Sequence, residues 1–225
     1  MKYILFITIL FGSFVSGAWA QTMTSVDEND PKARAILQKI DSQFKKSNSL
    51  EIPFTLTFEI PGKPAHTEKG IYYETGNKYK IQTTSQDIYC NGATNWVYIK
   101  NRKEVQITDF EPNAKSDFLS PKQLLKGYAN GDYIYAITEE KVHKGRSEVE
   151  IEFKPVKKGS SYTKIKLNID KTKNNLLSLR VFNRDGSRQT LTLGNVISNN
   201  SYDASFFNFD PKTVAGIRIE DLRID

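Results

Sequence analysis

Cysteine and histidine are scarce in this sequence, and their scarcity excludes several classes of protein. Cys90 is the only cysteine among 225 residues, which excludes an internal disulfide framework and a cysteine-rich zinc or iron-sulfur site. The two histidines, His66 and His143, stand in segments that read as turns, and we expect exposed loop residues rather than catalytic bases. The sequence also lacks Gly-x-Gly-x-x-Gly, Walker, Gly-x-Ser-x-Gly and His-Glu-x-x-His motifs. We therefore expect no enzyme, no cofactor and no metal.

Proline and glycine, at 8 and 13 residues, are too few for a collagen-like or low-complexity chain. Aromatic residues, by contrast, are too many for a disordered one, with 13 Phe, 11 Tyr and 2 Trp. The chain is 38% hydrophobic and 26% charged, as expected of a globular protein that buries a core. Its length permits one large all-β domain or two small domains.

The first 20 residues differ in character from the rest. Met1 and Lys2 precede an uncharged run that ends in Ala18-Trp19-Ala20, the pattern of a secretory signal peptide with a small-x-small cleavage site. We predict cleavage after Ala20, which leaves residues 21–225 as a single exported domain. A membrane anchor is the alternative, but the run is short for the roughly 20 residues that span a bilayer.

The chain is basic, with a net charge of +6 and a pI of about 9.2, and the binding partner that this charge indicates depends on where the protein is located. An exported basic protein more often meets anionic lipid or an anionic cell surface than nucleic acid. Lys154, Lys157 and Lys158 form one of the densest basic groups, and solvated strand ends explain it about as well as a binding patch. We interpret the group as solvated and expect no nucleic-acid partner.

Residues 33–44 have the spacing of an amphipathic helix, with apolar side chains at i, i+3, i+4, i+7 and i+11. Asp30 can accept hydrogen bonds from the first free amides, and Pro31 at the first helical position costs no hydrogen bond. From residue 54 the period changes to two, so Phe54 and Phe58 share one side of a strand.

The remaining sequence reads as strands separated by turn-forming pairs such as Asp185-Gly186. No strand precedes a helix long enough for a parallel crossover, which favours antiparallel pairing. The expected fold is mainly β with α, with short antiparallel strands after the N-terminal helix. The strands are expected at residues 70–74, 78–83, 87–90, 95–100, 104–110, 133–138, 147–154, 163–170, 176–183 and 187–193.

A short helical signature at residues 120–128 interrupts the strands, with Ser120 and Gln123 at capping-box spacing. Two helical turns are marginal in water on their own, so we expect the apolar side to rest on the sheet as a cover. A closed barrel or sandwich would bury the many aromatic side chains of the strands, whereas an open curved sheet would leave an apolar cavity. Periodicity leaves both open. Cys90 is interpreted as a small core residue.

Several short motifs also follow one another in a characteristic order. They are Lys69-Gly70-Ile71-Tyr72-Tyr73, Gly76-Asn77-Lys78-Tyr79-Lys80-Ile81, Asn91-Gly92-Ala93-Thr94-Asn95-Trp96-Val97-Tyr98 and Phe207-Asn208-Phe209-Asp210-Pro211. With the N-terminal helix and residues 120–125, this order resembles the LolA-type periplasmic carriers of outer-membrane lipoproteins over essentially the whole mature chain.

The resemblance implies an open, incomplete antiparallel β-barrel whose concave apolar face is covered by a lid of helices. It implies a protein without enzymatic activity, located in the periplasm. The implied partners are acylated lipoproteins, the inner-membrane ABC transporter that releases them and an outer-membrane receptor. We also expect a monomer.

Bulky apolar side chains suit an acyl cargo, because acyl chains offer no hydrogen bonds. We assign lipid binding to Leu56, Phe58, Ile71, Tyr73, Trp96, Tyr98, Phe153 and Leu167. We assign the lid and its contacts to Lys80, Leu124, Leu125 and Tyr128.

Lys80 stands where the resemblance places a family arginine that bonds the lid in the closed form. Lysine keeps the charge of that arginine but loses its planar fork. If Lys80 faces the cavity, Tyr79 and Ile81 point the other way and need a cover from another part of the chain.

Two other functions remain open. The protein is alternatively a related periplasmic protein that binds a different lipid or glycolipid, or senses the state of the envelope, without a transporter partner. A secreted hydrolase or a carbohydrate-binding β-protein is the third possibility, although no acidic pair stands beside an aromatic platform for a sugar.

Overall fold

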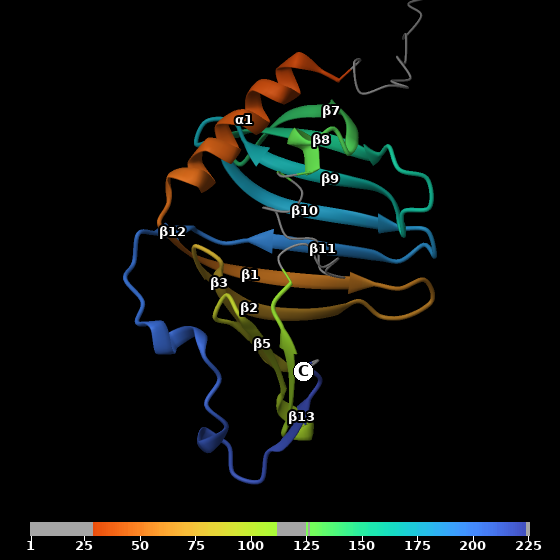
Figure 1. Cartoon of the computed structure of the whole chain (residues 1–225). Coiled ribbons are helices and arrows are strands. Elements are labelled where there is room, and N and C mark those ends of the chain that lie inside the picture. The colour runs from red at the N-terminus through yellow and green to blue at the C-terminus, as the bar shows by residue number, and fades with distance from the viewer. Residues whose placement is uncertain (1–28, 112–124, 126, 224–225) are drawn as a thin grey trace, which may run out of the picture.

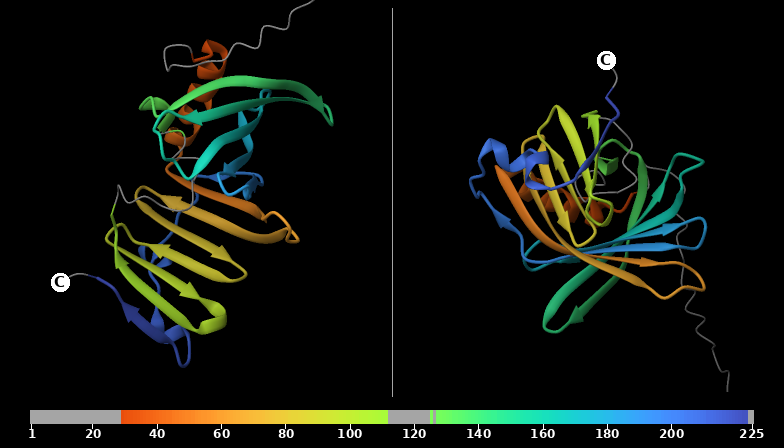
Figure 2. Two further views of the ribbon diagram at one scale, coloured as in Figure 1. Left: turned by 90° about the vertical axis from the view of Figure 1, so that its right-hand side faces the viewer. Right: turned by 90° about the horizontal axis from the view of Figure 1, so that it is seen from below.

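The computed structural model describes residues 29–111, 125 and 127–223. One 13-stranded sheet dominates it, in the order β13-β6-β5-β4-β3-β2-β1-β11-β10-β9-β8-β7, with β12 beside β1 (Figure 1). Within the described chain the edge strands β7 and β13 are not paired with each other, and the sheet curls without closing (Figure 2). The expected open antiparallel β-barrel with an N-terminal helix is confirmed.

The strands that form this sheet are β1 (Ser49–Glu59), β2 (His66–Thr75), β3 (Lys78–Thr83), β4 (Gln86–Cys90), β5 (Thr94–Ile99), β6 (Glu104–Asp109), β7 (Tyr133–His143), β8 (Arg146–Pro155), β9 (Tyr162–Asp170), β10 (Asn175–Asn183), β11 (Arg188–Leu193), β12 (Ile197–Ser198) and β13 (Arg218–Asp221). Three short 3-10 turns lie between them: η2 (Lys100–Arg102), η3 (Ala204–Phe207) and η4 (Pro211–Thr213).

The helix α1 spans Pro31–Lys46, and its predicted start is confirmed. A carboxylate oxygen of Asp30 accepts hydrogen bonds from the backbone N–H groups of Lys32 and Ala33, at 2.8 and 3.3 Å. The other oxygen accepts from the backbone N–H of Ile137 in β7, at 3.2 Å. One side chain therefore caps the helix and attaches it to the sheet.

The larger core lies between α1 and the strands β7 to β10. Ala33, Leu37 and Ile40 of the helix are buried there against the sheet, as the position of α1 in Figure 1 indicates. The strands contribute alternate residues to this core, namely Tyr133, Tyr135, Val149, Ile151, Phe153, Ile165, Leu167, Ile169, Leu176, Leu179 and Val181. The period of two in the sequence follows from this one-sided burial.

The smaller core lies on the other side of the sheet, over β4 to β6. Val105 and Ile107 of β6 pack there against Phe209, with Tyr89, Trp96, Tyr98, Val214 and Ile217 around them. Phe209, Val214 and Ile217 come from residues 199–223, which we call the C-terminal segment. This segment covers that side of the sheet over β4 to β6 and supplies β13.

The eleven expected strands are all present, and three details differ from the expectation. His66 begins β2 and His143 ends β7, so both histidines belong to strands rather than turns, although both are exposed. β1 already begins at Ser49. β13 pairs with β6 in parallel, against the expectation of antiparallel neighbours, because the C-terminal segment returns along the outside of the sheet before it joins the edge.

Candidate functional site

Strand register assigns every side chain of the sheet to one of two faces, because directly paired residues point to the same side. Phe54 of β1 pairs with Leu193 of β11 and Gly70 of β2, and the chain of pairs continues to both edges. We call the side that α1 covers the inner face and the other side the outer face. Leu50, Phe54 and the alternate residues of β1 belong to the inner face.

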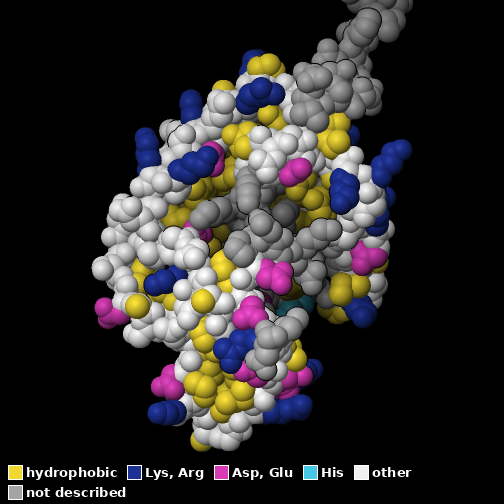
Figure 3. Space-filling model, viewed as in Figure 1, with side chains coloured by type: hydrophobic (Ala, Val, Ile, Leu, Met, Phe, Trp, Pro, Cys, Tyr) yellow, Lys and Arg dark blue, Asp and Glu magenta, His cyan; other side chains and the backbone are white. Residues whose placement is uncertain are grey.

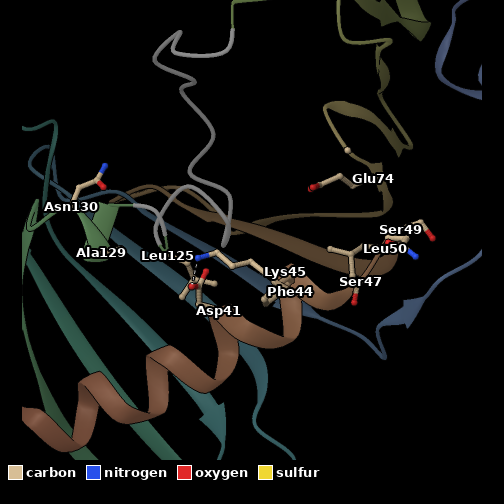
Figure 4. A pocket seen from close by; sticks show the side chains of 12 residues that line it. Asp41, Phe44, Lys45, Ser47, Ser49, Leu50, Glu74, Leu125, Ala129 and Asn130 are labelled. Carbon is tan, nitrogen blue, oxygen red and sulfur yellow. Dashed lines mark ion pairs between the residues drawn. The ribbon is translucent and has the colours of Figure 1, made fainter.

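A pocket of about 620 Å³ opens on the inner face, where the end of α1 meets the start of β1. Figure 4 shows Leu125, Leu50 and Glu74 around this space, with Asp41 and Lys45 of α1 beside it. Its described lining residues are Asp41, Phe44, Lys45, Ser47, Asn48, Ser49, Leu50, Glu74, Gly76, Leu125, Ala129 and Asn130. In the space-filling view, hydrophobic side chains gather near the middle of this face of the molecule (Figure 3).

The pocket has an apolar side and a polar side. Phe44, Leu50 and Leu125 supply the apolar side, and Leu125 is only 2% exposed. On the polar side Lys45 Nζ lies 2.7 Å from Asp41 Oδ2 and forms an i,i+4 ion pair on α1. The arrangement suits a ligand with an apolar body and a polar end.

Glu74 is the buried carboxylate of this pocket. Tyr72, two residues earlier on the same face of β2, donates its hydroxyl hydrogen bond to the Glu74 carboxylate. Burial raises the pKa of Tyr72 well above its usual range, and the neighbouring carboxylate raises it further. The phenol therefore stays protonated and remains a donor, which holds Glu74 in place.

Half-buried apolar side chains extend the inner face away from the pocket. Leu56 and Phe58 continue along β1, and Phe58 stacks on His66 of β2 with ring centroids 6.4 Å apart. Register places Ile81, Ile88 and Val97 on the same face of β3, β4 and β5.

Gly70 lies beside this row for a steric reason. An added Cβ there would stand 2.5 Å from the Phe54 ring and 2.5 Å from the carbonyl oxygen of Gln82. Any other residue would displace the Phe54 ring or the backbone of β3, so glycine is needed for this close packing on the inner face.

The eight residues assigned to lipid binding divide between the two faces, so they do not form the one surface expected of them. Leu56 and Phe58 lie half-buried on the inner face, while Phe153 and Leu167 lie on the same face but are fully buried under α1. The outer-face residues are Ile71, Tyr73, Trp96 and Tyr98. Of these, Tyr73, Trp96 and Tyr98 pack with side chains of the C-terminal segment. Lipid binding stays a prediction for all eight residues, and Leu56 and Phe58 are the two that lie half-buried on the inner face.

Lys80 also lies on the outer face, since it pairs with Tyr73 and Tyr89. Its Nζ lies 4.1 Å from the ring centroid of Phe206 and 5.0 Å from that of Tyr89. Burial lowers the pKa of Lys80, and the nearby Asp87 carboxylate opposes this shift. Of the two rings, that of Phe206 belongs to the C-terminal segment, on the side of the sheet opposite to Leu125. Lys80 therefore points away from the inner face, and Tyr79 and Ile81 lie on it.

The assigned lid is described only in part. Leu124 and the capping residues Ser120 and Gln123 lie outside the described residues. Leu125 and Tyr128 are helical and pack with α1, where the ring of Tyr128 meets that of Tyr135 edge-on at 5.9 Å.

Sequence reasoning missed the pocket because no single motif forms it. Phe44 and Asp41 come from the end of α1, Leu50 and Glu74 from paired positions of β1 and β2, and Leu125 from a distant helix. The one signal was Glu74, a carboxylate at the end of an otherwise apolar alternation. The described residues contain no group of His, Cys, Asp and Glu side chains arranged to hold a metal ion.

An open sheet with a helix over its concave apolar face defines a lipid-binding carrier fold. Residues 45–210 match the family described as outer membrane lipoprotein carrier protein LolA, and the chain belongs to this family. Members of the family are carriers rather than enzymes and act outside the cytoplasm. Within the described residues, no helix has the length and apolar character needed to cross a membrane.

Two solved structures share the fold. An uncharacterized conserved protein from Thermus thermophilus is 11% identical with a TM-score of 0.54, over 84% of this chain and 99% of that chain. The lipoprotein LppX from Mycobacterium tuberculosis is 14% identical with a TM-score of 0.50, over 78% of this chain and 100% of that chain. No curated protein sequence matches this chain.

Proposed function

We propose that this protein is a periplasmic carrier that binds the acyl chains of lipoproteins on its inner face and takes them from the inner to the outer membrane. The observation that carries the proposal is the pocket of about 620 Å³, continued by the half-buried row that includes Leu56 and Phe58. Its volume lies within the range of roughly 300–1,000 Å³ that is usual for ligand sites.

The energetics of the cargo explain why such a surface is needed. Exposing an acyl chain to water costs about 0.8 kcal/mol per CH2, so a chain of roughly sixteen carbons costs on the order of 12 kcal/mol. Leucine, isoleucine and phenylalanine side chains cover such a chain without requiring hydrogen bonds. The polar side of the pocket, with Glu74, Asp41 and Lys45, would then lie beside the headgroup and the first residues of the lipoprotein.

The proposal includes partners and a location. Residues 1–20 would act as the signal peptide, and residues 21–225 as a single carrier domain in the periplasm. An inner-membrane ABC transporter would supply the acylated lipoprotein, and an outer-membrane receptor would accept it. The family match supports this route.

A matched pair of variants on β1 tests the proposal. The side chain of Leu56 lies on the inner face, and that of its neighbour Thr55 lies on the outer face. Both side chains are half-buried. Leu56→Gln places an amide against the acyl chain at a cost of about 1–3 kcal/mol, which is roughly 5- to 150-fold in affinity. Thr55→Gln adds the same amide on the other side and should leave affinity unchanged.

The measurement is mass spectrometry of what co-purifies with each form from the periplasm, together with displacement of a fluorescent fatty-acyl probe. Acylated protein on the wild type and on Thr55→Gln, but not on Leu56→Gln, is the expected result. Free lipid alone would instead favour the related lipid-binding or envelope-sensing protein. If nothing acylated co-purifies and the probe does not bind the wild type, the carrier function is wrong.

A further inference from the structure

Three turns lie together at one end of the strands β1, β2 and β8 to β11, on the right-hand side in Figure 1. They are the β1–β2 turn (residues 60–65), the β8–β9 turn (156–161) and the β10–β11 turn (184–187). Arg184 donates hydrogen bonds from its backbone N–H to the Ser161 carbonyl, at 3.0 Å, and from Nε to the Ser160 carbonyl, at 2.8 Å. A Cβ added to Gly186 would lie 3.2 Å from Pro61. The three turns therefore form one continuous surface, which we call the turn surface.

The turn surface is basic. It carries Lys63, Lys157, Lys158 and Arg184 against a single acidic residue, Asp185. All four basic side chains are exposed, and within the described chain none of them is in an ion pair. Figure 3, in the same orientation as Figure 1, shows Lys and Arg side chains along this edge.

Apolar side chains stand beside these cations. Ile60 is 47% exposed and Val156 is 48% exposed, and each comes at the start of one of the turns. Pro61 and Pro64 flank Lys63 in the first turn and are exposed too. Exposed branched side chains therefore lie among lysines that have no ion-pair partner within the described chain.

The opposite end of the same strands differs in its electrostatics. There Lys141 Nζ lies 3.0 Å from Glu139, Lys171 Nζ 2.6 Å from Glu140, and Arg146 3.1 Å from Glu148. Val142 is 77% exposed at that end, but it lies among these ion pairs. At that end three cations are therefore paired with carboxylates, whereas none of the four cations of the turn surface is paired within the described chain.

From this contrast we propose that the turn surface binds the headgroup region of an anionic phospholipid bilayer. Each exposed lysine near an anionic membrane contributes about a fivefold gain in binding, and small apolar side chains add to it by entering the headgroup boundary. Binding through the turn surface would hold the protein at a membrane and leave the pocket free for cargo. The inference goes beyond the proposed function and does not depend on it.

Vesicle binding of the full mature chain tests the inference. The wild type should sediment with vesicles that contain phosphatidylglycerol and phosphatidylcholine, and raised salt should release it. The triple variant Lys63→Gln, Lys157→Gln, Lys158→Gln should bind roughly 100-fold more weakly. Ile60→Ser with Val156→Ser should weaken binding as well, at unchanged salt dependence.

A second triple variant provides the control, since it removes three exposed lysines from the opposite end. Lys46→Gln, Lys144→Gln, Lys173→Gln changes the net charge equally but leaves the turn surface intact. Equal losses in the two triple variants would mean that only net charge matters and would overturn the inference. Binding to pure phosphatidylcholine at the same strength, or no binding by the wild type, would overturn it too. Probe uptake in the pocket, measured on the same variants, separates this outcome from failure of the carrier function.

Discussion

Lys80 connects the sheet to the C-terminal segment through two aromatic rings. Its ammonium lies over Phe206 on one side and Tyr89 on the other, and it is half-buried between them. An ammonium over an aromatic face contributes about 0.5–1 kcal/mol where the site is partly exposed. Because Phe206 also packs edge-on against Tyr73 at 5.0 Å, the contact fixes the segment over β2 to β4.

A double-mutant cycle measures this contact. Lys80→Leu and Phe206→Leu, alone and combined, should give a coupling of about 0.5–1 kcal/mol in the free energy of unfolding, measured by urea denaturation. Lys69→Leu, on the same face of β2 but four residues from Tyr73 and so about 13 Å along the strand, should couple with Phe206→Leu by about zero.

Cargo transfer then distinguishes the two roles open to Lys80. If Lys80 acts through the lid, Lys80→Leu should slow the release of acylated protein while the coupling to Phe206 is absent. If it acts through the C-terminal segment, the coupling should be present and release should proceed at the wild-type rate.

Residue-level prediction from sequence succeeded where one face of a strand is buried and failed where both are. Phe54, Leu56 and Phe58 alternate with threonines, so their shared face could be predicted. In β2, Ile71 and Tyr73 face outward while Tyr72 faces inward, so both parities are apolar. A strand covered on both sides loses its alternation, and the sequence then does not indicate which side is the inner face.

Among the elements, the short helix at Leu125 has a structural role that its sequence left open. Leu125 is 2% exposed and belongs to the core cluster with α1, and it also lines the pocket. We therefore expect Leu125→Ala to lower the free energy of unfolding by about 2–5 kcal/mol, because it leaves a cavity beside α1.

Denaturant unfolding followed by far-ultraviolet circular dichroism measures this loss. Asn130→Ala, an exposed residue of the same pocket, is the control and should change stability by less than about 0.5 kcal/mol. A loss below about 1 kcal/mol for Leu125→Ala, together with weaker probe binding, would instead mean that Leu125 covers cargo rather than completing the core.

Element prediction from sequence was accurate for the helix and the eleven longer strands and missed β12 and β13. α1 has a capping residue, a proline at its first position and a regular apolar face, all of which are local signals. β12 has two residues and β13 four, too few for a period of two to be seen. The parallel pairing of β13 with β6 depends on the path of the C-terminal segment, which no local pattern encodes.

At the scale of the whole molecule, one continuous sheet carries two cores of unequal size on opposite faces. The larger core under α1 contains buried residues from each of the strands β7 to β10. The smaller core has Val105, Ile107 and Phe209 as its buried members, and the C-terminal segment covers it. Regions with few buried apolar contacts open at lower free energy, so the two halves should differ in local stability.

Native-state hydrogen exchange, followed by mass spectrometry, tests this difference. The amides of β9, between Ile165 and Ile169, should exchange slowest, at the free energy of global unfolding, and those of β13 should exchange much faster. Phe209→Ala removes the largest of the three buried side chains of the smaller core, a change of about 3–5 kcal/mol in the free energy of unfolding. It should speed exchange in β4 to β6 while β8 to β10 keep their protection. Equal acceleration in both halves would mean that the sheet unfolds as one unit. The C-terminal segment would then be part of the global fold rather than a separately opening cover of the outer face.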